Sequence, residues 1–159
     1  MKKILLVVGL MVTSICLCAC SSLVKEKKND DLALPAHEYN IYLSTEITTV
    51  LNQLTTRMGT AKVLASNPTE DRVKDELSAL DYSISVVQEC LDVVDKLNIK
   101  GTYTTEKNES IRLIKQTLTI LDNYKVSLIN KNSEDIRNSI QDMELVFASL
   151  TGLTNSTYK

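Results

Sequence analysis

The chain has little from which an active site could be built. Its 159 residues include no tryptophan, one phenylalanine, one histidine, four glycines and two prolines. Zinc sites of the Cys/His type and di-iron sites with paired Glu-x-x-His motifs need more histidine than His37 alone supplies. Phosphate-binding and dinucleotide-binding loops need glycines that are missing here, and no Gly-x-Ser-x-Gly motif occurs. We therefore expect no catalytic residues, no metal, no cofactor and no enzymatic activity.

Long hydrophobic runs are missing too, except at the N-terminus. There, Lys2 and Lys3 precede an apolar run from Ile4 to about Leu17, and small residues follow up to Cys20. This order of basic, apolar and small residues is typical of a signal peptide. A transmembrane helix is the alternative, but the run is shorter than the roughly 20 residues that span a bilayer. We predict that residues 1–19 are a cleaved signal peptide.

The end of this segment resembles the lipobox of bacterial lipoproteins. Leu17 is the aliphatic residue three positions before the cysteine Cys20, and Ala19 is the small residue before it. Cys18 is a mild departure from the pattern, and the resemblance covers only residues 1–20. It implies lipid transfer to the Cys20 thiol, cleavage before Cys20, and anchoring on the extracytoplasmic side. That side is the outer face of the membrane in a Gram-positive host, and the outer membrane is the expected location in a Gram-negative one.

Removing residues 1–19 changes the composition of the remaining chain. Basic residues fall from 18 to 16 against 20 acidic ones, which leaves a formal charge of about -4. A mildly acidic surface argues against a nucleic-acid partner. If Cys20 is lipidated, Cys90 is the one free thiol, and its position in an apolar helical register favours burial over reactivity.

Residues 20–34 are rich in charge and lack periodicity, so we expect a flexible tether after the lipidated cysteine. Residues 35–153 form the predicted domain, with a frayed tail at 154–159. Within it, apolar residues recur at steps of three and four, which indicates amphipathic helices at about 35–66, 68–98, 104–130 and 133–151. The repeat in the second helix also suits a dimeric coiled coil, but a second apolar row favours packing within one chain.

Short connections between these helices predict an all-α, antiparallel up-down-up-down four-helix bundle. We expect the longer first pair to project beyond the fourth helix or to bend over it. We also expect Asn67 to cap the second helix, Asn132 or Ser133 to cap the fourth, and Gly152 to end it. Gly59 suggests a close helix crossing or a slight kink.

Tyrosine is the main aromatic residue. In the predicted topology Tyr39, Tyr42 and Tyr103 share one end of the bundle, where they form either a contact patch or a cover over the core. Acidic residues near the helix starts, such as Glu70 and Glu76, are expected to be solvated charges that complement the helix dipoles.

These features favour a membrane-anchored lipoprotein whose bundle is a non-enzymatic interaction or structural module at the bacterial cell envelope. Its expected partners are membrane lipid, through acylated Cys20, and an envelope protein. One alternative is a bundle that binds a small apolar ligand or lipid. Another is a lipoprotein of a phage or mobile element that keeps competing DNA from entering.

Overall fold

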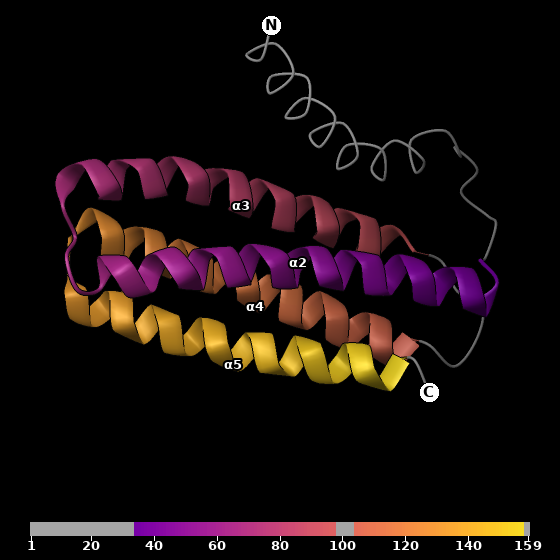
Figure 1. Ribbon diagram of the computed structural model, residues 1–159. Helices are drawn as coiled ribbons and strands as arrows, with labels where there is room; N and C mark the ends of the chain where they lie inside the picture. Colours follow the sequence, from indigo (N-terminus) through magenta and orange to yellow (C-terminus); the bar gives the residue numbers. More distant parts are fainter. Residues whose placement is uncertain (1–33, 98–103, 158–159) are drawn as a thin grey trace, which may run out of the picture. The chain divides into compact units, whose positions relative to one another are not determined.

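The bundle domain is built entirely from helices in the parts of the chain that the computed structural model describes, residues 34–97 and 104–157. These parts belong to one compact unit that spans residues 33–159. The predicted signal peptide, Cys20, most of the tether and Tyr103 lie outside the described residues. The helices, numbered as in Figure 1, are α2 (Ala36–Leu64), α3 (Glu70–Lys96), α4 (Thr104–Ile129) and α5 (Ser133–Thr157).

The four helices form an antiparallel bundle. Each packs against the next along the chain, and α5 packs back against α2, while the diagonal pair α2 and α4 touch only sparingly. The chain colours in Figure 1 show that α2 and α4 run in one direction and that α3 and α5 return in the other. This arrangement confirms the predicted up-down-up-down topology.

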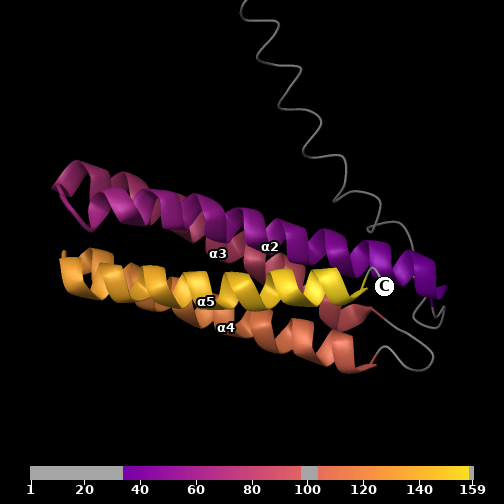
Figure 2. The same ribbon diagram turned by 60° about the horizontal axis from the view of Figure 1, so that its bottom comes forward.

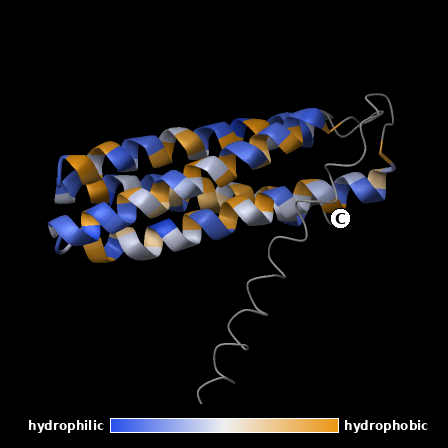
Figure 3. Cartoon of the chain, turned by 90° about the horizontal axis from the view of Figure 1, so that it is seen from above, coloured by the Kyte–Doolittle hydropathy of each residue, from blue (hydrophilic) through white to orange (hydrophobic). Residues whose placement is uncertain are grey.

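The core lies along the bundle axis and takes apolar residues from all four helices. Hydrophobic and hydrophilic positions alternate along every helix in Figure 3, as in amphipathic helices. Burying one large aliphatic or aromatic side chain stabilises a fold by roughly 1.5–3 kcal/mol, so this core is the main source of stability. The largest fully buried side chains include Tyr39, Leu43, Ile47, Leu54, Leu80, Ile114, Leu121, Tyr124, Leu128 and Ile136.

The helix starts agree with the sequence prediction at one connection and differ at another. Asn132 caps α5, since its Oδ1 accepts hydrogen bonds from the backbone N–H groups of Glu134 at 3.0 Å and Asp135 at 3.3 Å. Asn67 does not cap α3. That helix begins at Glu70 after Thr69, whose side chain makes no capping hydrogen bond. The predicted start at residue 68 was therefore two residues early.

The structure contradicts the prediction for Gly152 and one of the two alternatives for Gly59, the close crossing. Gly152 does not end α5, which continues to Thr157, so the helices have 29, 27, 26 and 25 residues. Of the first pair, α2 extends past the end of α5, as Figures 1 and 2 show. Gly59 does not mark a close crossing, because a Cβ added there would meet no atom within 4 Å. The same holds for Gly152. Both glycines lie on the solvent side of their helices.

Candidate interaction surface

The middle of helix α2 turns its charged side chains toward α3. Between Glu38 and Lys62 its only charged residues are Glu46 and Arg57. Glu46 is half-buried and hydrogen-bonded with the thiol of Cys90 on α3. Arg57 is 8 % exposed and forms an ion pair across the same seam. The middle of α2 therefore carries its charge on the buried side.

The ion pair of Arg57 belongs to a cluster that joins three helices. Its Nη1 donates to Oε2 of Glu76 on α3 at 2.8 Å, and the Tyr124 hydroxyl on α4 donates to the other carboxylate oxygen at 3.3 Å. Burial raises the pKa of Glu76, while the charge of Arg57 and the hydrogen bonds from both partners act in the opposite direction. Burial and the neighbouring carboxylate also raise the pKa of Tyr124.

A polar seam at seven-residue spacing extends this cluster along α3. Glu76, Ser83 and Cys90 face polar partners on α2, and the Ser83 hydroxyl donates to Oε1 of Gln53 at 2.8 Å. The expectation that Glu76 is a solvated charge at the helix start was wrong, because Glu76 is 4 % exposed. The seven-residue spacing of these polar side chains is the signal that could have located the seam.

A groove of about 350 Å³ opens beside this seam, between α2 and α3. Arg57, Glu76, Arg72 and Asp75 are among its lining residues, so its two cationic groups are matched by two carboxylates. The described residues contain no group of three or more His, Cys, Asp or Glu side chains that could hold a metal ion. The polar groups of Arg57 and Glu76 are directed at each other.

From Ile41 to Gly59, the outward side of α2 presents, together with the adjoining α5 residues after Glu144, a surface without charged residues. Figure 2 shows the two helices side by side, and the Lys62–Glu144 ion pair of 2.9 Å joins them near one end. From Leu145 to Thr157, α5 contains no charged residue. We call this surface the uncharged face; its exposed residues are Ile41, Thr45, Thr48, Asn52, Thr55, Thr56 and Gly59 of α2, and Leu145, Ala148, Ser149, Gly152 and Asn155 of α5.

The hydroxyl groups of this face are already hydrogen-bonded within their own helices. Thr45, Thr48, Thr55 and Thr56 each donate to the backbone carbonyl four residues earlier, at 2.7–2.9 Å. Ser149 does the same on α5 at 3.1 Å. Covering a hydroxyl group leaves an unpaired donor only if that donor has no partner. The uncharged face can therefore lose its water without orphaning these donors.

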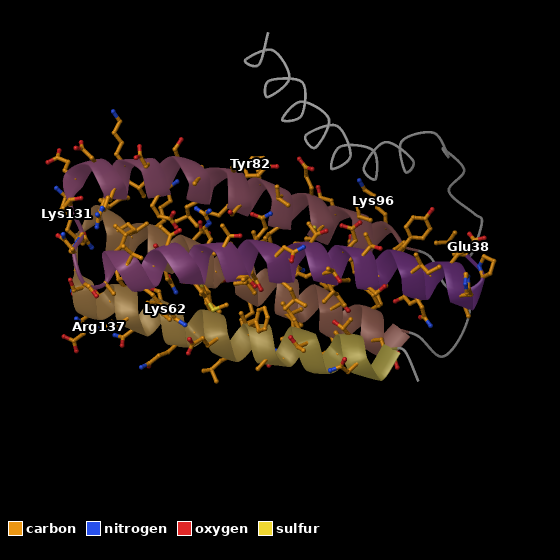
Figure 4. All side chains as sticks on the ribbon, in the orientation of Figure 1. Glu38, Lys62, Tyr82, Lys96, Lys131 and Arg137 are labelled. Atoms are coloured by element: carbon orange, nitrogen blue, oxygen red, sulfur yellow. The ribbon has the colours of Figure 1, made fainter. Side chains whose placement is uncertain are left out.

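The outward side of α3 has the opposite character. It exposes both acidic and basic residues along its length, from Glu70 to Lys96. Tyr82 is the large exposed aromatic residue on this helix, with 68 % of its surface accessible, and Figure 4 shows it pointing away from α2. The mixed charges of α3 are typical of a face in contact with water.

The structure does not support a contact patch made of Tyr39, Tyr42 and Tyr103. Tyr39 is fully buried, so it belongs to the core and cannot contribute to a surface. Burial, together with the nearby Glu106 carboxylate, raises its pKa to about 12. Tyr42 is half-buried against the core, and Tyr103 lies outside the described residues. Of the two interpretations, Tyr39 fits the cover over the core.

Cys90 is buried, as the sequence predicted. Only 2 % of its surface is exposed, and burial and the nearby Glu46 carboxylate raise the pKa of its thiol. A thiol that is hidden and held protonated is a poor nucleophile.

Comparisons with known proteins identify no relative: no protein-family model matches the chain, and neither a curated protein nor a solved structure does. None of the described helices is both long enough and apolar enough to cross a membrane.

Proposed function

We propose that this protein is a lipoprotein anchored through Cys20 on the extracytoplasmic side of a bacterial membrane, and that its bundle is a non-enzymatic interaction module. The contact surface of the module is the uncharged face of α2 and α5. The observation that carries the proposal is the reversed charge distribution in the middle of α2, where Glu46 and Arg57 face α3 while the outward side from Ile41 to Gly59 has no charge.

Charged side chains are normally placed in water and rarely buried. The centres of protein interfaces, in contrast, are depleted of charged residues relative to the rest of the surface. From Ile41 to Gly59, α2 keeps its charges away from solvent and exposes threonine, asparagine and small residues, so it shares the charge depletion of such a centre. Its hydroxyl groups, which already have acceptors, keep the desolvation penalty low.

The anchor rests on the lipobox. Because each buried CH2 of a lipid chain contributes about 0.8 kcal/mol, two or three acyl chains would hold the protein firmly in a leaflet. The module would then meet its partners at the membrane surface, within reach of the tether of residues 20–34.

The anchor is tested by metabolic labelling with a radioactive or clickable fatty acid in a bacterial host. We expect Cys20→Ala to abolish labelling and to leave an uncleaved precursor or a mislocalised form. Cys18→Ala is the matched control, because a small residue in that position is compatible with the motif, and it should be labelled like the natural chain. Normal labelling of Cys20→Ala would overturn the proposed anchor.

The module is tested by placing a photo-crosslinking amino acid at Thr55 of the full chain, and separately at Ser78 on α3. Both positions are exposed. We expect defined crosslinked products from position 55 and none, or only weak ones, from position 78. Equal product patterns from the two positions would contradict the assignment of the uncharged face as the contact surface.

A further inference from the structure

The hydrogen bonds of Arg57 leave part of its buried guanidinium without a partner. Nη1 donates to Oε2 of Glu76 at 2.8 Å, but Nε is enclosed and has no acceptor among the described residues. Nη2 donates no hydrogen bond to them either, and it is not enclosed as Nε is. The N–H of Nε and one N–H of Nη2 point in the same direction and form a fork that matches the two oxygens of a carboxylate. Arg57, which is 8 % exposed, therefore keeps this fork unpaired.

Glu76 is held in a position from which it does not fill the fork. Its Oε1 accepts a hydrogen bond from the Tyr124 hydroxyl on α4 at 3.3 Å, and its Oε2 accepts the bond from Nη1 of Arg57. A two-oxygen contact with the fork would need both carboxylate oxygens on the other edge of the guanidinium. Because a buried donor without an acceptor is costly, the folded chain is stabilised when a molecule from outside supplies that acceptor.

The groove between α2 and α3 gives a ligand access to Arg57. Its volume of about 350 Å³ lies at the lower end of the roughly 300–1,000 Å³ that is typical of ligand pockets. Arg57 is among the lining residues, and Val63, Leu64 and Ala79 contribute apolar wall. Small-molecule sites combine such walls with a few polar groups that fix the orientation of the ligand. The groove therefore suits a small apolar group that carries one polar end.

The charges around the groove decide the chemical class of that polar end. Arg72 and Asp75 of α3 are exposed and line the groove, and neither forms an ion pair with another described residue. Arg72 attracts an anion and Asp75 repels it, so binding depends on a good match with the fork of Arg57. A carboxylate has two oxygens for the two N–H groups of the fork. A phosphate group has three strong acceptor oxygens, so one of them would be left unpaired against the apolar wall.

We propose that the groove binds a carboxylate attached to a small apolar group, and that Nε and Nη2 of Arg57 hold the two carboxylate oxygens. The apolar group packs against Leu64 and Ala79, and Arg72 strengthens the binding. A free short-chain acid and the carboxyl terminus of a peptide share this chemistry. The site lies between α2 and α3, apart from the uncharged face, and it does not depend on the proposed anchor.

The site is tested by NMR titration of the full isotope-labelled chain, held in an uncharged detergent, with sodium hexanoate at constant ionic strength. The chain has four arginines, Arg57, Arg72, Arg112 and Arg137, so each Nε–H signal can be followed separately. We expect a saturable shift of the Arg57 signal, and no shift for Arg112 and Arg137, which lie outside the groove lining. Hexanamide, a neutral molecule of the same shape, and inorganic phosphate should each bind at least tenfold more weakly. The site is overturned if the Arg57 signal does not shift, or if either of these two probes binds as well as hexanoate.

Two charge variants of exposed groove residues should change the affinity in opposite directions and leave the buried ion pair intact. We expect Arg72→Gln to weaken hexanoate binding at least threefold and Asp75→Asn to strengthen it at least twofold, because the first removes an attraction and the second a repulsion. Arg112→Gln on α4 and Asp71→Asn on α3 are matched controls outside the lining, and both should bind like the natural chain. Groove variants that bind hexanoate like these controls would contradict the proposal.

Arg57→Lys tests the fork itself. Lysine keeps the positive charge but lacks the planar pair of N–H groups. We expect this variant to bind hexanoate at least tenfold more weakly while its circular dichroism spectrum stays helical. Unchanged affinity in the folded variant would overturn the role of the fork.

A peptide probe distinguishes the two sources of the carboxylate. The dipeptide alanyl-leucine has a free carboxyl terminus on an apolar residue, and its C-terminal amide is the neutral counterpart. Tighter binding of the dipeptide than of hexanoate would assign the site to peptide ends, and the reverse order would assign it to free acids. In both cases the dipeptide amide should bind at least tenfold more weakly than the dipeptide. An amide that binds as well as the acid would contradict a carboxylate site.

Discussion

The two sides of α2 reverse the usual relation between charge and burial. The side toward α3 holds Glu46 and Arg57, and the side toward solvent holds threonines, an asparagine and a glycine. Substitutions on the buried side are expected to destabilise the fold, because a buried ion without its partner is costly. The solvent side contributes little to the packing of the bundle, because its hydroxyl groups form hydrogen bonds within α2 itself. Folding therefore depends on the first side, and the second is left free to be shaped by contact with a partner.

Breaking the buried Arg57–Glu76 ion pair should produce the largest change in the free energy of unfolding. We expect Arg57→Met to lower the free energy of unfolding by about 3–5 kcal/mol, because it leaves the Glu76 carboxylate buried without its cation. Replacing both residues with methionine should restore much of that loss, because no uncompensated charge remains. Urea unfolding of the two single variants and the double variant measures this. A double variant less stable than either single one would show that the pair itself is a net source of stability.

The buried side should also respond to pH. Burial raises the pKa values of Glu46 and Glu76, so in the folded chain both carboxyls keep their protons to higher pH than in the unfolded chain. Between the ordinary pKa near 4.5 and the raised value, the folded chain binds more protons, and stability falls as pH rises. Glu46→Gln should weaken this fall, and unfolding curves measured from pH 4 upward would detect the change. Identical pH profiles for the variant and the natural chain would contradict the expectation.

Replacing Gly59, on the solvent side of α2, should increase the stability of the bundle. Glycine inside a helix is less favourable than alanine by about 0.5–1 kcal/mol, and the space around Gly59 is open. We expect Gly59→Ala to raise the free energy of unfolding by up to that amount, as measured by thermal or urea unfolding. A loss of stability would mean that a neighbour approaches this position more closely than the structure indicates.

The smallest effect on folding is expected for a charge placed on the uncharged face. Thr55→Glu should change the free energy of unfolding by no more than about 0.5 kcal/mol, because exposed substitutions away from caps and cores rarely do more. A large loss of stability would mean that Thr55 serves folding, and the comparison between the two sides of α2 would then fail.

The sequence predicted the number, order and approximate bounds of the helices because each has an apolar stripe that is visible locally. The predicted end of α5 was wrong, because Gly152 resembles the glycine that commonly follows a helix C-terminus. The helix continues there because Leu150 is buried and Leu153 packs against the core, and these contacts outweigh a helix penalty of about 1 kcal/mol for one exposed glycine. Such contacts join distant segments and cannot be judged from a local pattern.

The buried polar groups were the hardest part to predict. Arg57 and Met58 are neighbours, and an apolar residue such as Met58 is the expected core position, but the structure buries Arg57 more deeply. The reason is Glu76, a partner 19 residues away on another helix. The candidate interaction surface was missed as well, because absence of charge on one helix face becomes visible only once the buried positions of Glu46 and Arg57 are known.

Because Cys90 is a buried free cysteine, its reaction with a thiol reagent can report the opening of the bundle. A thiol reagent can react with a hidden cysteine only when the surrounding helices separate, so its labelling rate follows the population or the rate of opening. Because Cys90 lies between α2 and α3 next to Glu46, the labelling rate would report the separation of these two helices. Separation of α2 from α3 can thus be followed in the natural sequence, by the rate at which the Cys90 thiol becomes accessible to a reagent.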